Sequence, residues 1–409
     1  MVQVITSTPS YVINEPLGIG QGNWDKPEHL ATGQINMHHL FKTLAIEAGD
    51  KVQPLPRSSS GFDLETARYT DPLLPGRDLS GEQLLNRRVF NDSLLIMHRG
   101  EVVHESYRNG MQAEDRHVIH SCTKSLCSMI VAIAIAEQRL DPARAISNYI
   151  PQFQERAEWQ GVSLQHVLDM QAGIQYSEDY TNPNAHYWHY ARAAGYYPPL
   201  PGDSAIGAKA WIYQNLTVRD DEPGTHFVYN SCLANVLGMA LENVYEMDLS
   251  EIFERKLYQK VGAESAGYFN TDPQGFPITE GQFNLRLRDF ARCAYLMINS
   301  GKNFAGEQVL PPGFTENIVR PNNEAKLAYH RKVGDTMFPN AQYRDQFWVF
   351  EPEQSQFTML GIHGQFAWID LERDVMMVGN GSFPQQDGPI MMGALKILWE
   401  ETAQKLSAR

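Results

Sequence analysis

The hydrophobic positions along the chain are most concentrated in residues 127–136, which are apolar apart from Ser128 and rich in alanine. This pattern predicts a helix that is hydrophobic on nearly every side and therefore lies in the protein core. The segment is too short to span a bilayer. It follows Ser121-Cys122-Thr123-Lys124, so a serine and a lysine stand where a buried helix begins.

Other periodic segments indicate both strands and helices. Residues 93–97 and 101–107, joined by Arg99-Gly100, predict a β-hairpin. Helical periodicity marks residues 164–170, 285–300 and 391–406. Strand-like runs near the C-terminal end cover residues 347–350, 357–361, 365–369 and 375–378.

Strands near both ends of the sequence, with helices between them, predict an α+β fold in which one antiparallel sheet is flanked by helices. We expect an N-terminal wrap over residues 1–85, which have weak periodicity and many Pro, Gly and Ser. Residues 86–137 and 286–409 would form the α/β domain, and residues 138–285 an inserted helical domain. The crevice between these two domains is the expected active site.

Composition narrows the possible partners. The 409 residues carry a formal net charge of −14, which argues against a nucleic-acid or anionic-membrane partner because either would need a basic face. The first residues show no export signal, and the four cysteines have no Cys-x-x-Cys spacing. We therefore expect a cytoplasmic protein with free thiols. Cys122 could serve as a thiol nucleophile, but a small buried residue is the favoured interpretation.

The sequence predicts neither a metal nor an organic cofactor. The glycines of residues 18–22 lack the strand and helix of a dinucleotide-binding loop, which favours a plain turn. His38-His39, and the pair His186 and His189, have no further ligands at the spacing of a metal site.

Ser121 and Lys124 are the first candidates for chemistry. Three positions apart on a helix, the two side chains share a face and can touch. A helix N-terminus also stabilises developing negative charge. Serine followed by lysine in the pattern Ser-x-x-Lys, which occurs once in this chain, is typical of a serine nucleophile with a lysine base.

Two later segments offer partners for that pair. Tyr229 precedes a run with helical spacing and could pass a proton between the site and a leaving group, although a tyrosine that only packs at a helix start is the alternative. Residues 361–365, Gly-Ile-His-Gly-Gln, lie in a strand context, and a backbone N–H there could form an oxyanion hole with that of Ser121. His363 as a triad base is the competing interpretation, which is disfavoured because Lys124 already supplies a base and no G-x-S-x-G elbow is present.

Seven aromatic residues crowd the segment 176–197, and we interpret them as a pocket wall, with a core patch under a long loop as the alternative. They are Tyr176, Tyr180, Tyr187, Trp188, Tyr190, Tyr196 and Tyr197.

The order of these motifs resembles that of the class C β-lactamase superfamily, and the closest similarity is to its nylon-oligomer branch, the 6-aminohexanoate-dimer hydrolases. The resemblance extends from about Trp24 to the C-terminal region and implies the β-lactamase/transpeptidase-like fold. The segments that carry it are residues 97–103, 168–174, 177–180, 288–292 and 361–365.

The resemblance implies a role for each matching residue. Ser121 would be the acylated nucleophile, Lys124 its base and Tyr229 the proton relay. Tyr180 would close over the substrate amide, and Ile362 would give the second oxyanion N–H. The implied activity is hydrolysis of linear amides of ω-amino acids, with small esters as side substrates, and the implied assembly is a homodimer.

The chain departs from the family pattern at two places. Ser231 stands where Tyr-x-Asn would have its asparagine, and residues 360–363 replace the Lys-Thr-Gly strand motif. The second change removes the cation that would hold a β-lactam carboxylate, so β-lactamase activity is not expected. Glu280 is expected to face the pocket, where it would favour a substrate amine. The alternatives are a carboxylesterase with negligible amidase activity and a non-catalytic scaffold.

Overall fold

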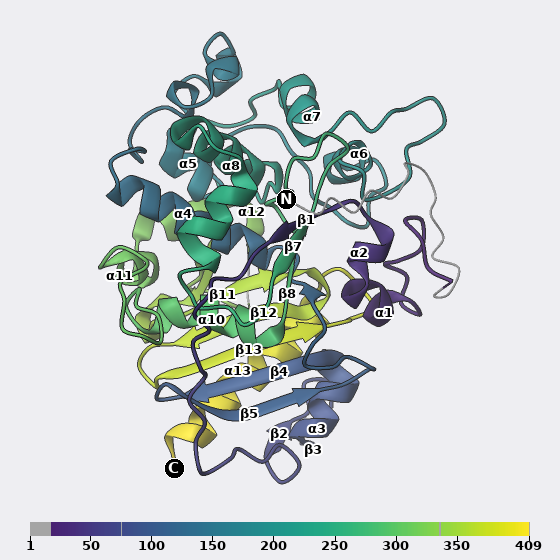
Figure 1. Ribbon diagram of the computed structural model, residues 1–409, viewed down its shortest axis with the longest axis vertical. Helices are drawn as coiled ribbons and strands as arrows, with labels where there is room; N and C mark the ends of the chain where they lie inside the picture. The colour runs from purple at the N-terminus through teal and green to yellow at the C-terminus, as the bar shows by residue number, and fades with distance from the viewer. Residues whose placement is uncertain (1–17, 75, 335–336, 409) are drawn as a thin grey trace.

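The computed structural model describes residues 18–74, 76–334 and 337–408. In these residues a seven-stranded antiparallel sheet has the order β5-β4-β13-β12-β11-β10-β9 and occupies the lower half of Figure 1. The predicted hairpin and the four predicted C-terminal strands all belong to it, so the expected sheet from two parts of the chain is confirmed. Its strands are β4 (Asn91–His98), β5 (Glu101–Tyr107), β9 (Gln342–Arg344), β10 (Phe347–Glu351), β11 (Gln356–Gly361), β12 (Gln365–Asp370) and β13 (Val375–Gly381).

Helices cover both faces of this sheet, which is why β12 and β13 are buried at every residue. The predicted amphipathic helices are confirmed as α10 (Leu287–Ile298) and α13 (Pro389–Ser407). Helix α10 lies against β4, β12 and β13, and α13 packs on the opposite face (Figure 1). The rings of Trp399 on α13 and Trp368 on β12 stack with centroids 6.2 Å apart. The α+β prediction is therefore confirmed.

A second, four-stranded sheet has the order β1-β7-β8-β6 and was not predicted from the sequence. Its strands are at most four residues long, too short for an alternating pattern to stand out. Strand β6, at the edge of this sheet, leads directly into the turn that carries Ser121. The strands are β1 (Thr43–Ile46), β6 (His117–Val118), β7 (Gly267–Asn270) and β8 (Phe283–Leu285).

The apolar helix α4 (Cys122–Ala136) lies between the large sheet and the helical region. Every residue from Cys122 to Ala134 is buried, so the predicted core helix is confirmed. It contacts β11 and β12 on one side and α8 on the other. The helices of this region are α5 (Leu164–Leu168), α6 (His186–Ala193), α7 (Ala208–Asn215), α8 (Cys232–Tyr245) and α9 (Leu249–Phe253).

The remaining elements are short. Near the N-terminal end they are α1 (Leu30–Ile35), α2 (Met37–Leu40), β2 (Arg68–Thr70), β3 (Asp78–Ser80) and α3 (Gly81–Leu84). Before the C-terminal strands they are α11 (Phe314–Val319) and α12 (Asn323–Val333).

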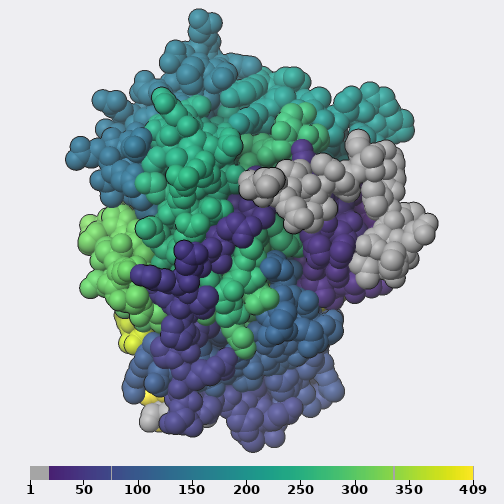
Figure 2. Space-filling view, viewed as in Figure 1, coloured from purple at the N-terminus to yellow at the C-terminus, as the bar shows by residue number. Residues whose placement is uncertain are grey.

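The described part of the N-terminal segment runs along the surface of the large-sheet region and of the helical region, as the purple atoms in Figure 2 show. The Trp24 ring stacks on the His120 ring with centroids 6.1 Å apart, and Tyr197 donates a hydrogen bond of 2.6 Å to Asp25. The segment therefore contacts the residue that precedes Ser121. The three-part division at residues 85, 137 and 285 stays a prediction.

Two negative findings concern the described residues. None of their helices is long and apolar enough to cross a membrane. No group of three or more His, Cys, Asp or Glu side chains in this part of the chain is arranged to hold a metal ion. All four cysteines are buried and unpaired.

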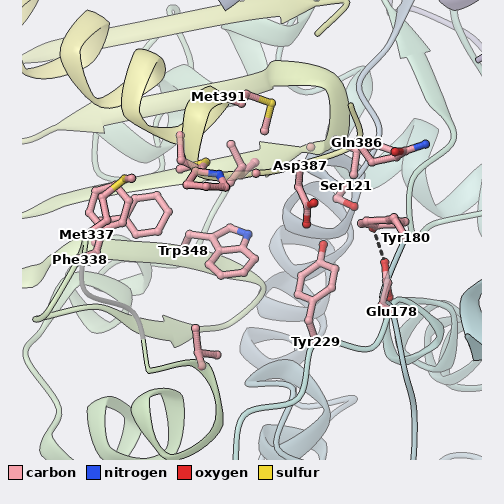
Figure 3. A pocket seen from close by; sticks show the side chains of 18 of the residues that line it. Ser121, Glu178, Tyr180, Tyr229, Met337, Phe338, Trp348, Gln386, Asp387 and Met391 are labelled. Atoms are coloured by element: carbon pink, nitrogen blue, oxygen red, sulfur yellow. Dashed lines mark hydrogen bonds between the residues drawn. The ribbon is translucent and has the colours of Figure 1, made fainter. Parts of the chain in front are cut away.

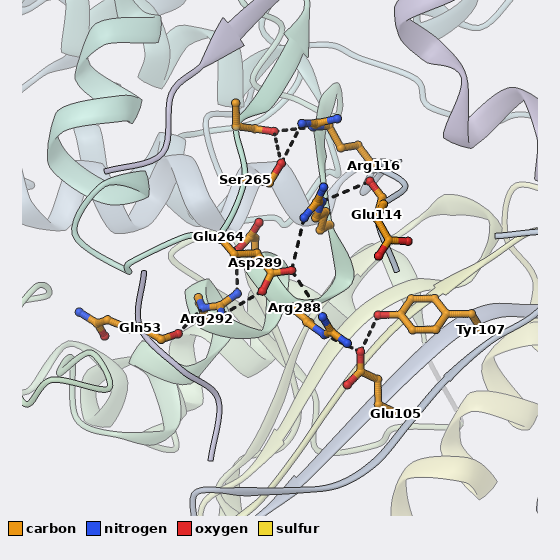
Figure 4. A network of polar contacts seen from close by, with 12 residues as sticks. Gln53, Glu105, Tyr107, Glu114, Arg116, Glu264, Ser265, Arg288, Asp289 and Arg292 are labelled. Carbon is orange, nitrogen blue, oxygen red and sulfur yellow. Dashed lines mark hydrogen bonds and ion pairs between the residues drawn. The ribbon is translucent and has the colours of Figure 1, made fainter. Parts of the chain in front are cut away.

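A polar network joins α10 to its surroundings (Figure 4). Arg292 donates to the Asp289 carboxylate at 2.8 Å, to Glu264 at 3.2 Å and to the Gln53 carbonyl at 2.9 Å. Arg288 on the same helix donates to Glu105 of β5 at 2.7 Å. The network links the N-terminal segment, the large sheet and the loop around residue 264.

Arg292→Met is expected to destabilise the fold by about 3 kcal/mol, because it leaves the carboxylate of Asp289 buried without its cationic partner. The side chains of Arg292 and Asp289 are 2% and 0% exposed. Urea unfolding followed by circular dichroism would measure the change. Arg255→Met is the control, since Arg255 is 59% exposed in its pair with Glu251 and should cost less than about 1 kcal/mol. An equal loss in both variants would contradict the prediction.

Candidate active site

Ser121 lies at the N-terminal end of α4, where the chain turns from β6 into the helix. The preceding residue, His120, has a φ of +42°, in the left-handed region that a residue with a side chain rarely adopts. Strain of this kind persists only where surrounding packing holds it. Here the packing comes from the Trp24 and His363 rings, whose centroids lie 6.1 and 5.7 Å from that of His120. Ser121 lines a cavity (Figure 3).

Lys124 is brought against Ser121 by one turn of the helix, as their spacing predicts. Its Nζ lies 2.7 Å from the Ser121 Oγ and also donates to the backbone carbonyl of Glu280. The side chain is almost completely buried, with the residue 1% exposed. Burial lowers the pKa of Lys124, because it disfavours the charged form, while the nearby Glu178 and Glu280 carboxyls act in the opposite direction.

Tyr229 completes a cluster with these two residues. It stands just before α8, and its phenol is directed toward Ser121 (Figure 3). The Lys124 Nζ lies 5.1 Å from the centre of its ring. The ring stacks on Trp348 with centroids 5.4 Å apart. Burial raises the pKa of Tyr229, and a hydrogen bond with Ser121 opposes that shift, so the phenol holds its proton at neutral pH.

The end of β11 comes close to the turn before Ser121. A Cβ on Gly361 would lie 2.8 Å from the carbonyl oxygen of Ile119 and 3.1 Å from the Cβ of His120, so a larger residue would push the strand away. Gly361 and Ile362 both line the cavity with Ser121. The structure thus brings the segment that contains the expected oxyanion donor, Ile362, to the edge of the site.

His363, by contrast, does not line the cavity. It is 1% exposed, and its Nδ1 lies 2.8 Å from the carbonyl oxygen of Phe383. Its backbone N–H donates to the carbonyl of Gln386 at 2.8 Å. The inclusion of His363 among the substrate-binding residues is therefore wrong. Its contacts hold the loop that carries Gln386 and Asp387, and the competing triad interpretation has no geometric support.

Tyr180 lines the cavity, and Glu178 fixes its position. The Glu178 carboxylate accepts hydrogen bonds from the Tyr180 phenol at 2.8 Å, from the Ser231 hydroxyl at 2.6 Å and from the Ser231 backbone N–H at 2.9 Å. Ser231, where the family pattern would have asparagine, thus connects the Tyr229 motif to the 177–180 segment. Burial raises the pKa of Glu178, with Lys124 and the three donors opposing the shift.

The prediction that Glu280 faces the pocket is wrong. Glu280 is 3% exposed and is absent from the cavity lining. The backbone carbonyl of this residue accepts a hydrogen bond from Lys124, and its carboxylate accepts one from the buried Tyr196 phenol. Burial raises the pKa of Glu280 to about 7.

The interpretation of the aromatic segment 176–197 as a pocket wall is also wrong for most of its residues. Of the seven aromatic side chains, Tyr180 lines the cavity. Tyr190 and Tyr196 are 0% and 3% exposed and belong to the core. The alternative of a core patch describes them better, since the Tyr190 ring packs against the Tyr196 ring and against that of Trp211 on α7.

Cys122 is not a plausible nucleophile. Its thiol is buried, and burial raises the pKa far above the ordinary value of a cysteine, which leaves no reactive thiolate.

The cavity beside Ser121 has a volume of about 560 Å³, within the range of small-molecule sites. Its polar end includes Glu178, Gln386 and Asp387, which the sequence analysis did not identify. Asp387 has a pKa raised by burial and by Asp179. No lysine, arginine or histidine stands among the described residues that line the cavity.

Comparisons with known proteins bear on the family to which the chain belongs. The family model described as Beta-lactamase matches residues 82–388. A protein named 6-aminohexanoate-dimer hydrolase, from Paenarthrobacter ureafaciens, is 31% identical over 366 residues, which cover 89% of this chain and 88% of that protein.

Solved structures share the fold. The structure described as "Putative 6-aminohexanoate-dimer hydrolase from Bacillus anthracis" is 21% identical, with a TM-score of 0.85 over 98% of this chain and 99% of that one. EstCE1, described as a hydrolase with promiscuous acyltransferase activity, is 16% identical, with a TM-score of 0.61 over 78% of this chain and 96% of that one.

Proposed function

Since this chain belongs to the beta-lactamase family, we propose that it hydrolyses amide and ester bonds of small linear substrates through an acyl-enzyme on Ser121. The observation that carries the proposal is the contact of 2.7 Å between the Lys124 Nζ and the Ser121 Oγ, in a buried site that lowers the lysine pKa. A lysine that is neutral part of the time can accept the serine proton.

The reaction follows from these positions. As the Ser121 Oγ attacks the substrate carbonyl carbon, its proton passes to Lys124. The bond to the leaving nitrogen or oxygen then breaks, and the leaving group takes a proton from Tyr229, which regains one from Lys124. Water attacks the acyl-enzyme by the same path in reverse and releases the acid. The backbone N–H groups of Ser121 and Ile362 would hold the oxyanion.

The electrostatics of the cavity support a substrate without a carboxylate near the reacting carbonyl. Glu178 and Asp387 line the polar end, and no cation stands among the described lining residues. A β-lactam carboxylate would find no partner there. Tyr180, whose phenol donates a hydrogen bond to Glu178, would contact the substrate amide.

The first test is labelling with a fluorophosphonate, with the modified residue mapped by peptide mass spectrometry. Labelling of Ser121 supports the proposal, and an unlabelled Ser121 in folded protein would favour the non-catalytic scaffold. Hydrolysis of a 6-aminohexanoate dimer compared with that of a butyrate ester then separates amidase from carboxylesterase. The dimer is chosen because the relative at 31% identity carries that name.

Tyr229→Phe is expected to lower kcat about a hundredfold, because the leaving group loses its proton donor while the ring keeps its place on Trp348. The loss should be larger for an amide, whose amine needs the proton, than for a p-nitrophenyl ester, whose leaving group does not. Steady-state kinetics on both substrates measure the difference. Tyr213→Phe, a half-buried tyrosine absent from the cavity lining, is the control. Equal losses on both substrates would rule out the relay.

Location and assembly belong to the same proposal. We keep the cytoplasm as the proposed location, which the four unpaired cysteines support. The homodimer stays a prediction from the resemblance.

A further inference from the structure

The described residues 18–41 form a small N-terminal lobe that contains α1 and α2 (Figure 1). The lobe has a hydrophobic core that is separate from the large core of the molecule. Trp24 and Leu40 of the lobe share this small core with Val118 of β6, and α1 contacts the same strand. Since β6 leads into Ser121, the lobe packs on the backbone that carries the proposed nucleophile.

The first link from the N-terminal lobe to the site runs through Trp24. Its side chain is buried, and its ring stacks on the His120 ring with the two planes 22° apart. Helix α1 lies directly against the Trp24 backbone, because a Cβ on Gly33 would be 2.6 Å from the Trp24 carbonyl oxygen. The backbone angles of His120 determine the direction of the Ser121 N–H, since the peptide unit between them is planar. The stacked rings therefore help to fix that direction.

The second link runs through Gln34, in the last turn of α1. Gln34 is 0% exposed, and its Oε1 accepts a hydrogen bond of 3.0 Å from the Nε2 of Gln365. The same Nε2 donates to the carbonyl oxygens of Ile362 at 3.2 Å and of Gly381 at 2.7 Å. Gln365 thus connects α1 to the turn that contains Ile362, the expected second oxyanion donor.

The two links end at segments that contact each other. The centroids of the His120 and His363 rings are 5.7 Å apart, and a Cβ on Gly361 would lie 3.1 Å from that of His120. Two N–H groups that stabilise one oxyanion must keep a fixed separation, because each has to reach the same oxygen at hydrogen-bond distance. The N-terminal lobe contacts the supports of both groups and can fix this separation.

We infer that Trp24 and Gln34 are positioning residues, which together set the distance between the two oxyanion N–H groups; this rests on the proposed function of Ser121. Neither side chain lines the cavity. Each acts through a single neighbour that supports one of the two N–H groups. Loss of either should slow the reaction without weakening substrate binding, because the oxygen carries its full negative charge only after attack by the serine.

The main test is Gln34→Met, which keeps the length of the side chain and removes the acceptor for Gln365. We expect kcat for p-nitrophenyl acetate to fall at least about tenfold, with KM within about twofold of that of the unmodified protein. Gln34→Glu keeps an oxygen acceptor and should retain kcat within about threefold. Gln21→Met is the matched control, because the Gln21 side chain donates at 3.5 Å to the Leu40 carbonyl inside the lobe. It should leave kcat unchanged.

Trp24 is tested by two variants that differ in the ring. Trp24→Phe keeps an aromatic ring against His120, whereas Trp24→Leu does not. The leucine variant should lower kcat about tenfold and the phenylalanine variant less than about threefold. Truncation of a buried indole also destabilises the small core, so urea unfolding checks that each variant is folded. Gln34→Met leaves the volume of the core nearly unchanged and decides the outcome if Trp24→Leu does not fold.

Inhibition by phenylboronic acid separates positioning from a general loss of structure. Its boron bonds to the Ser121 Oγ and presents a negatively charged oxygen, as the tetrahedral intermediate does, so its affinity depends on the two N–H groups. The inhibition constant should rise in Gln34→Met by about the same factor as kcat/KM falls. The pH at which kcat/KM levels off should not move, because Gln34 does not contact Lys124.

The possible failures can be told apart. An unchanged kcat in Gln34→Met, a rise in KM alone, an equal loss in Gln21→Met, or an unchanged affinity for the boronic acid would each overturn the positioning role while Ser121 still carried the activity. Turnover that persists in Ser121→Ala would instead overturn the proposed function.

Discussion

Ser121→Ala should abolish hydrolysis, with kcat for p-nitrophenyl acetate falling by about four orders of magnitude or more. The reason is that no neighbouring group can replace the hydroxyl. Lys124 would then lie beside a methyl group, and the Cys122 thiol is buried with a raised pKa. Steady-state assays of the purified variant would measure the loss of kcat. Labelling of the variant by the fluorophosphonate should also disappear.

A matched serine on the same helix provides the control for this experiment. Ser128 is 1% exposed, and its hydroxyl has no hydrogen-bond partner among the described residues. Ser128→Ala should therefore leave both turnover and labelling nearly unchanged. Retention of full turnover in Ser121→Ala would show that the serine is not the nucleophile.

The part of the site that could be predicted from the sequence is the part fixed by local geometry. Ser121 and Lys124 are one turn apart on a helix, and helical spacing alone determines that their side chains meet. The predicted buried helix, the hairpin and the C-terminal strands depended on periodicity in the same way. These features need no knowledge of how distant segments pack.

The parts that failed depend on the direction in which a loop side chain points. Glu280 contributes its carbonyl rather than its carboxylate, because the backbone at that residue turns toward Lys124. Asp387 enters the cavity on a loop that His363 holds through three hydrogen bonds, two with Phe383 and one with Gln386. Glu178 lay within a segment that the resemblance singled out, but nothing in the sequence showed that Ser231 and Tyr180 would both donate to it.

Lys124 stands in an environment whose effects oppose one another. Burial lowers its pKa, whereas the carboxyls of Glu178 and Glu280 raise it. The burial effect is the larger, so the net shift is downward. Both acids also have pKa values raised by burial, and that of Glu280 lies at about 7, which weakens their hold on the lysine proton. Lys124 can therefore lose its proton at a lower pH than an ordinary lysine does.

Lys124→Met is expected to lower kcat/KM about a thousandfold, because the methionine fills the same space but cannot accept the Ser121 proton. In the unmodified protein the active form holds Lys124 neutral, so kcat/KM should rise with pH and level off below pH 10.5, the ordinary lysine value that burial lowers. The residual activity of Lys124→Met should lack this rise. Lys124→Arg tests charge alone, since a guanidinium stays protonated over the whole range and should be as inactive as methionine. If the rise of kcat/KM with pH survives in either variant, the base is another group. If the rise is lost in both variants while Ser121 is still present, the neutral amine of Lys124 is the group that activates the serine.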